Sequence, residues 1–167
     1  MIDPTRIGIS GHSFGGWTAI EAGRRDTRVS VVVALAPGFH DPSSPSIAGE
    51  LGGRPLLLVG GSVDHTTPFS EQMAAYAAAS APEGLLEILG AGHLDYTALC
   101  EVPALVSIVD DGCDPATLDP ARVRAITGWL VLRWLRRYMD GDLAVDPELA
   151  EVSVEGLGIA AEWMYAP

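Results

Sequence analysis

The run VSVVVAL at residues 29–35 constrains the fold of this chain more than any other stretch of its sequence. Apart from Ser30, every residue in the run is apolar, and four of the seven are valines. A continuous β-branched run of this length is typical of a strand that is buried on both faces. Such strands occur in parallel sheets that helices cover on both sides, so the run favours an α/β fold.

Apolar runs and helical segments alternate along the rest of the chain. The first helix is expected from Phe14 to Arg24, and the second in the alanine-rich stretch that follows Thr67 as N-cap and Pro68 as first helical residue. Residues 36–54, rich in Pro, Ser and Gly, predict a loop. Strands are expected at residues 6–10, 29–35, 55–60 and 85–89.

The third helix has the clearest signals. Asp119 and Pro120 predict its N-cap and first residue, and the helix is expected to run to about Tyr138. One apolar face recurs at helical spacing in Val123, Ile126, Leu130 and Trp134. Together these elements predict a mostly parallel sheet of about four strands flanked by helices. The tail from residue 140 has weak periodicity.

Three chemically suggestive residues each come just after a predicted strand. Ser13 follows the first strand, Asp64 the third and His93 the fourth. In parallel sheets the functional loops gather at the carboxyl ends of the strands. We therefore expect these three side chains at one edge of the sheet.

The stretch GHSFG, residues 11–15, predicts how the serine would be presented. A serine hydroxyl is a weak nucleophile that needs exposure, a base and backbone donors for the developing oxyanion. A sharp strand-to-helix turn supplies these, and Gly11 and Gly15 are expected to remove side chains that would collide. The amide of Phe14, at the start of the helix, is the expected oxyanion donor.

The motifs GHSFGGWTA, GGSVDHTTP and GAGHLDY resemble those of the α/β-hydrolase superfamily, and the resemblance covers roughly residues 3–139. It is strongest to bacterial esterases related to platelet-activating-factor acetylhydrolases, dienelactone hydrolases and polyester hydrolases. The order Ser13, Asp64, His93 is the nucleophile–acid–histidine order of that superfamily. The resemblance implies a catalytic triad of these residues, with Gly11, His12 and Gly15 forming the elbow.

Each assignment has a structural alternative. A serine between glycines can simply form a turn, and Asp64 can cap the turn before the second helix. Asp95, two residues after His93, is a rival acid. The other histidines compete for the role of base: His12 sits beside the nucleophile and is expected to point elsewhere, whereas His65 adjoins the proposed acid and His40 lies in a loop.

Other side chains have mainly structural interpretations. Trp17 and Phe39 are candidates for an acyl pocket, although aromatic residues near strand ends often belong to the core. Trp129 and Trp134 are expected to pack. The run DDGCD at residues 110–114 predicts a solvated turn rather than a metal site, because its acids lack histidine spacing.

Composition narrows the remaining choices. The 167 residues are 48% hydrophobic and 19% charged, which predicts one packed domain, at residues 1–139, with a tail at 140–167 packing on it. A formal net charge of −12 argues against nucleic-acid partners. No apolar run can span a bilayer and no export signal opens the printed chain. Cys100 and Cys113 are either free thiols or, in an oxidising compartment, a disulfide.

The expected function is hydrolysis of carboxylic esters, with short acyl groups favoured, through an acyl-enzyme and without a metal or cofactor. A serine peptidase of the prolyl-oligopeptidase type is the alternative enzyme. In the resembled fold several strands precede the nucleophile strand, so the resemblance implies a partial fold here. A weak or silent hydrolase that acts as a binding or assembly module is therefore a second alternative. A homodimer formed through the exposed first strand is also expected.

Overall fold

The computed structural model describes residues 3–41, 43–102, 111–113, 118–152 and 160–167. Its strands are β1 (Ile7–His12), β2 (Val29–Leu35), β3 (Leu56–Gly61), β4 (Glu83–Ile88) and β5 (Ala161–Ala166). Its α-helices are α1 (Phe14–Arg25), α2 (Phe69–Ala78), α4 (Pro120–Tyr138) and α5 (Asp146–Ala150). Its 3₁₀ helices are η1 (Ser44–Leu51), η2 (His93–Tyr96), η3 (Ala98–Glu101) and η4 (Leu143–Val145).

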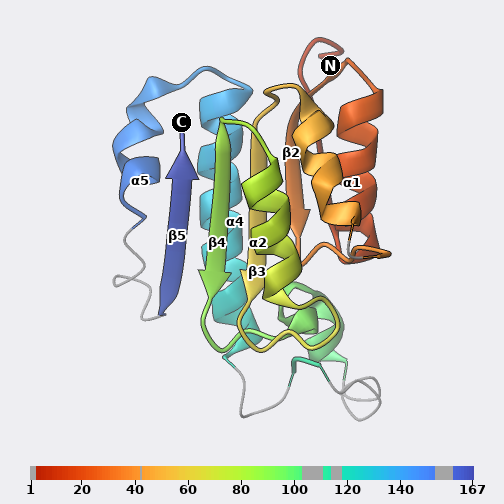
Figure 1. Cartoon of the computed structure of the whole chain (residues 1–167). Helices are drawn as coiled ribbons and strands as arrows, with labels where there is room; N and C mark the ends of the chain where they lie inside the picture. Colours follow the sequence, from red (N-terminus) through yellow and green to blue (C-terminus); the bar gives the residue numbers. More distant parts are fainter. Residues whose placement is uncertain (1–2, 42, 103–110, 114–117, 153–159) are drawn as a thin grey trace.

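The five strands form one sheet in the order β1-β2-β3-β4-β5. β1 to β4 pair in parallel, and β5 runs antiparallel to β4. Figure 1 shows β2, β3 and β4 pointing the same way and β5 pointing the opposite way. The α/β class and the mostly parallel sheet are confirmed, and within the described residues β5 adds a fifth, antiparallel strand to the four expected.

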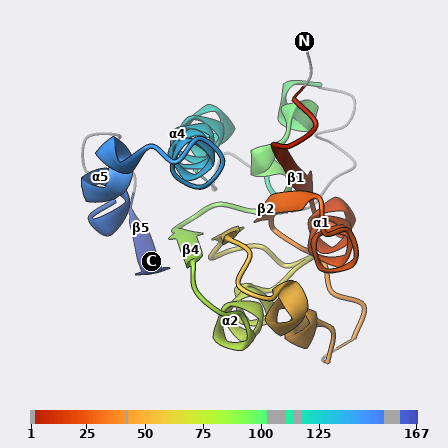
Figure 2. The ribbon, with the colours of Figure 1, turned by 90° about the horizontal axis from the view of Figure 1, so that it is seen from above.

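Helices cover both faces of the sheet because alternate strand residues face opposite sides. On one face, α1, η1 and α2 pack on residues such as Val32, Leu56 and Leu58. On the other, α4 and α5 pack on residues such as Val33 and Leu57. Figure 2, viewed from above, shows α4 and α5 on one side of the strands and α1 and α2 on the other.

Local signals place α4 as expected. The side chain of Asp119 accepts a hydrogen bond from the Ala121 amide, 2.9 Å long, and Pro120 is the first helical residue. The predicted apolar face is fully buried: Val123, Ile126, Leu130 and Trp134. Two other expectations are wrong: η1 lies within the predicted loop 36–54, and Pro68, not Thr67, is the N-cap of α2.

The edge strand β1 pairs with β2 alone among the described residues. A cavity of about 470 Å³ lies beside β1, lined by Ile7–Ser10, by Leu135 of α4 and by Met139, which follows α4. This cavity lies apart from Ser13. No helix within the described part of the chain is long and apolar enough to cross a membrane.

Candidate active site

Ser13 occupies a strained turn between β1 and α1, with φ 58° and ψ −125°. A positive φ is uncommon for a residue other than glycine and persists only where the surroundings hold it. Here the end of β2 supplies the restraint: the Ser13 amide donates to the Leu35 carbonyl at 2.9 Å, and the Gly38 amide donates to the Ser13 carbonyl at 3.0 Å. The expected elbow geometry is therefore present at Ser13.

The glycines of the elbow do not contribute equally. A Cβ at Gly11 would lie 2.1 Å from the Gly15 carbonyl oxygen, which no real contact allows. A Cβ at Gly15 would meet nothing within 4 Å, so the expected collision there is wrong. Gly16 is the second tight position, because its Cβ would lie 3.0 Å from the Pro37 backbone.

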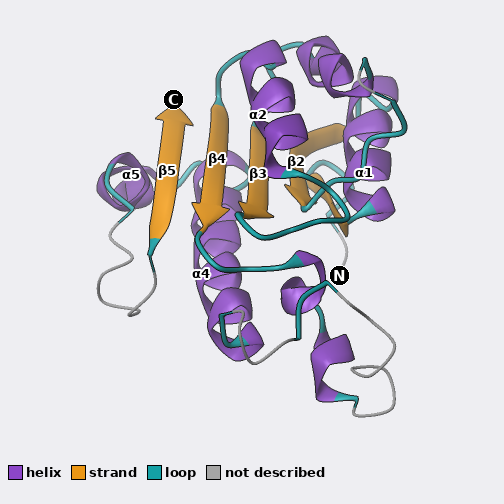
Figure 3. Ribbon diagram, turned by 60° about the horizontal axis from the view of Figure 1, so that its bottom comes forward, coloured by secondary structure: helices purple, strands orange, loops and turns teal. Residues whose placement is uncertain are grey.

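The structure brings Ser13, His93 and Asp64 together from the ends of three strands. His93 Nε2 lies 2.9 Å from Ser13 Oγ, and His93 Nδ1 lies 2.9 Å from Asp64 Oδ2. Both His93 and Asp64 are 5% exposed. Figure 3 views the molecule with the carboxyl ends of the parallel strands, where these loops gather, brought forward.

Asp64 belongs to the acid loop, residues 64–67, which satisfies its carboxylate. Oδ1 accepts hydrogen bonds from the Thr66 and Thr67 amides, and Oδ2 accepts from the Thr67 hydroxyl at 2.7 Å. That hydroxyl also lies 3.2 Å from His93 Nδ1. Thr67, expected only as a helix cap, therefore helps to orient the acid and the imidazole.

Asp111 is a site residue that the sequence analysis missed. Its carboxylate is buried and accepts hydrogen bonds from the amides of His65, Thr66 and His93 and from the Thr66 hydroxyl. Burial raises the pKa of the Asp111 carboxyl, but these hydrogen bonds outweigh it and hold that pKa below its usual value. The expectation of a solvated turn is wrong at Asp111; Asp110 and Asp114 lie outside the described residues.

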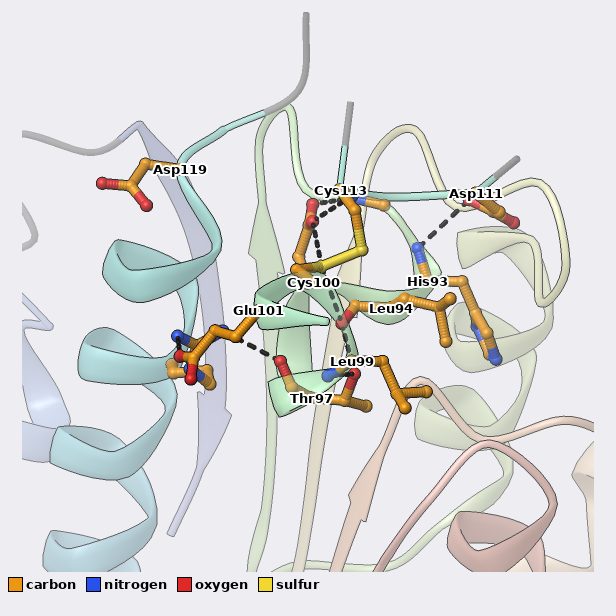
Figure 4. Close-up of a disulfide and its surroundings, with 12 residues drawn as sticks. His93, Leu94, Thr97, Leu99, Cys100, Glu101, Asp111, Cys113 and Asp119 are labelled. Atoms are coloured by element: carbon orange, nitrogen blue, oxygen red, sulfur yellow. Dashed lines mark hydrogen bonds and ion pairs between the residues drawn. A yellow bond between two sulfur atoms is a disulfide. The ribbon is translucent and has the colours of Figure 1, made fainter. Parts of the chain in front are cut away.

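A disulfide joins Cys100 to Cys113, so the free-thiol alternative is not what the structure contains (Figure 4). Beside it lies Asp95, the rival acid, whose carboxylate accepts hydrogen bonds from the amides of Gly92 and Cys113. Burial raises the pKa of Asp95. Asp95 thus holds the histidine loop, residues 92–95, rather than the imidazole. Asp95, Cys100 and Cys113 cluster as metal ligands would, but the disulfide occupies both sulfurs.

The other histidines have separate positions. His12 Nε2 lies 2.8 Å from the His93 carbonyl oxygen, and the two rings are 4.7 Å apart. Burial lowers the pKa of His12, which favours the neutral ring at this contact. His12 therefore supports the backbone of His93 instead of pointing away from the site. His65 is exposed and its amide binds Asp111, while His40 packs on Trp17 at 4.6 Å between ring centres.

The two residues predicted to line an acyl pocket, Trp17 and Phe39, lie in different surroundings. Trp17 stacks on the exposed ring of Phe14, the residue directly after Ser13, with ring centres 5.4 Å apart. Phe39 instead packs against the core cluster on the α1 face of the sheet. The aromatic surface beside Ser13 is therefore formed by Phe14, Trp17 and His40.

The parallel sheet, the strained Ser13 after β1 and the histidine and aspartate after later strands define an α/β-hydrolase-like fold. One solved structure similar to the chain is a ferulic acid esterase from Streptomyces cinnamoneus, with a TM-score of 0.63 and 25% sequence identity. The match covers 84% of this chain and 42% of that one, so the chain spans less than half of its neighbour's length. No protein-family model and no curated protein matches the chain. The expected resemblance to α/β-hydrolase-type esterases is confirmed.

Proposed function

We propose that this chain hydrolyses carboxylic esters through an acyl-enzyme formed on Ser13. The observation that carries the proposal is the continuous path from Ser13 Oγ through His93 to Asp64, with both hydrogen bonds 2.9 Å long. A weak hydroxyl nucleophile needs an adjacent base, and the base needs a third group to orient it. The likeness to a ferulic acid esterase supports an ester rather than an amide as substrate.

In the first step, Ser13 Oγ attacks the ester carbonyl carbon while its proton passes to His93 Nε2. The Nδ1 proton of His93 remains hydrogen-bonded to Asp64, which stabilises the imidazolium as it forms. The oxyanion faces the Phe14 amide at the positive end of α1. The tetrahedral intermediate then breaks its bond to the alcohol oxygen, which takes the proton from His93.

In the second step, a water molecule attacks the acyl carbon and gives its proton to His93 Nε2. Collapse of this intermediate breaks the bond to Ser13 Oγ, which regains the proton, and the carboxylic acid leaves. Water is the co-substrate, and no redox change occurs. Ser13, His93 and Asp64 act in both steps, and the proposed steps require no metal or cofactor.

The substrate proposal concerns the groups next to the scissile bond. Esters with short acyl groups are the first to test, and aryl esters suit the exposed ring of Phe14, which lies beside the nucleophile and stacks on Trp17. Planar rings gain from such stacking. An ester carrying p-nitrophenol as its alcohol combines both properties.

Labelling with a fluorophosphonate tests the proposal directly, because Ser13 Oγ would displace fluoride and bond to phosphorus. The native chain and Ser10→Ala, an exposed serine on the same strand, should label, whereas Ser13→Ala should not. Asp64→Asn should lower kcat by up to about 10⁴-fold on p-nitrophenyl acetate. Cleavage of peptide anilides in preference to esters would favour the peptidase, and an unlabelled native chain would favour a silent binding module.

A further inference from the structure

Asp111 connects two loops that follow different strands. Its Oδ2 accepts hydrogen bonds from the acid loop, through the amides of His65 and Thr66 at 2.9 and 2.6 Å and the Thr66 hydroxyl at 2.6 Å. Its Oδ1 accepts from the histidine loop, through the His93 amide at 3.1 Å. One carboxylate therefore spans from the loop of the proposed acid to that of the proposed base.

The segment that carries Asp111 is itself attached to the histidine loop. We name residues 111–113 the clasp. The Leu94 amide donates to the Asp111 carbonyl at 3.0 Å, and the Cys113 amide donates to Asp95 Oδ1 at 2.8 Å. The contact is close, since a Cβ at Gly92 would lie 2.7 Å from the Gly112 backbone.

The disulfide adds a covalent attachment at the end of the clasp. Cys113 bonds to Cys100 in η3, which follows the histidine loop in the chain. Figure 4 shows the Asp111 side chain directed at the His93 backbone nitrogen, and the disulfide that joins Cys113 to Cys100. The backbone of the clasp and its disulfide thus fix the position of Asp111, and its carboxylate binds both the acid loop and the histidine loop.

We propose that Asp111 is a positioning residue, which keeps the acid loop and the histidine loop in the relative placement that puts His93 between Asp64 and Ser13. This inference rests on the proposed function. It adds to that function a residue, Asp111, that aligns the proposed base His93 by binding its backbone amide and not its imidazole ring.

The chemistry of the carboxylate explains why another residue would not serve. Both oxygens face donors, so an ionised aspartate is the group that satisfies them all. In Asp111→Asn one oxygen becomes an NH₂ group, which faces an N–H donor of either the acid loop or the histidine loop. One of the two attachments is then lost, and a displacement of about 1 Å at a reacting group can cost about 10²-fold in rate.

The experiment compares Asp111→Asn with Asp26→Asn, the same change at a partly exposed aspartate that is the C-cap residue of α1, at the end away from Ser13, and pairs with Arg28. We expect fluorophosphonate labelling of Asp111→Asn to slow by about tenfold or more. For p-nitrophenyl acetate, kcat should fall while KM stays within about threefold. Asp26→Asn should stay within about twofold of the native rate, because exposed ion pairs contribute little.

A second measurement reports on geometry without any turnover. The His93 Nδ1 proton, shared with Asp64, should give a low-field proton resonance that is absent from His93→Gln. Asp111→Asn should lose or broaden this resonance, and Asp26→Asn should keep it. Native labelling rate together with a native resonance in Asp111→Asn would overturn the inference and leave the proposed function standing.

Failure of the proposed function has a different signature. Suppose that the native chain resists labelling but its low-field resonance disappears in Asp111→Asn. This result would refute ester hydrolysis by Ser13 and support the positioning role of Asp111. If Asp111→Asn does not fold, Thr66→Val tests the positioning role instead, because it removes one hydrogen-bond donor to Asp111 Oδ2 and keeps the side-chain shape. Labelling about threefold slower in a folded Thr66→Val chain supports the inference, and an unchanged rate overturns it.

Discussion

Two alanine substitutions in the elbow should have opposite effects. In Gly11→Ala the new Cβ would lie 2.1 Å from the Gly15 carbonyl oxygen and 2.3 Å from its carbon. Both are backbone atoms of α1, and ordinary contact begins at 3.4 Å, so the helix itself must move. In Gly15→Ala the Cβ has nothing within 4 Å, although the motif treats the two glycines alike.

The magnitudes follow from these contacts. Overpacking of a well-packed site costs about 1–3 kcal/mol, and a rigid backbone obstacle places Gly11→Ala at about 3 kcal/mol or more. Gly15 is the second residue of α1, where alanine gains about 0.5–1 kcal/mol over glycine. For a chain of this length each kcal/mol moves Tm by about 2–4 °C. Gly11→Ala should therefore lower Tm by roughly 6–12 °C and Gly15→Ala should raise it by roughly 1–4 °C.

Thermal unfolding followed by circular dichroism, with urea unfolding as a second measure, checks both values. Labelling of Ser13 by fluorophosphonate should slow in Gly11→Ala, because a shifted α1 moves the serine and the Phe14 amide together. It should persist in Gly15→Ala. A Gly11→Ala chain as stable as the native one, or equal damage from both substitutions, would refute the steric argument.

Three further predictions concern other parts of the molecule. Denatured, unreduced protein should show no titratable thiol, and reduction of Cys100–Cys113, which closes a separation of 13 residues, should cost about 3 kcal/mol of stability; two titratable thiols would exclude the bridge. Burial holds the pKa of His12 below its ordinary value of 6.5, so the unfolded chain binds more protons below about pH 6.5, and stability should decrease as the pH is lowered through that range. His12→Asn should weaken this pH dependence of the melting temperature, and an unchanged dependence would count against the assignment to His12. We also propose self-association through the open edge of β1, so light scattering should give twice the 17.5 kDa chain mass, and Ile9→Pro should shift it toward monomer or aggregate. A monomeric mass for the native chain at a protein concentration of tens of micromolar would contradict this self-association.

Tertiary contacts decided several features that no local pattern contains. Thr67 and Pro68 carry an N-cap signal, yet the Thr67 hydroxyl binds Asp64, because α2 starts where the acid loop meets the histidine loop. β5 was missed because its residues, AEWMYA, are mostly half-buried and lack a clear alternation, and their partner β4 is more than seventy residues earlier. Strand pairing at that distance depends on the fold around it.

The sequence by itself determined the elements whose signals are local. Periodicity and capping chemistry suffice to predict these elements, because each depends on residues that are close in the sequence. They are the buried strand Val29–Leu35, the cap and apolar face of α4, and the glycine-flanked Ser13. The role of Asp111 was decided only by the tertiary structure. It lies 46 residues after His65 and 18 after His93, and an aspartate beside glycine and cysteine looks like a solvated turn until parallel strands bring those two loops to its carboxylate.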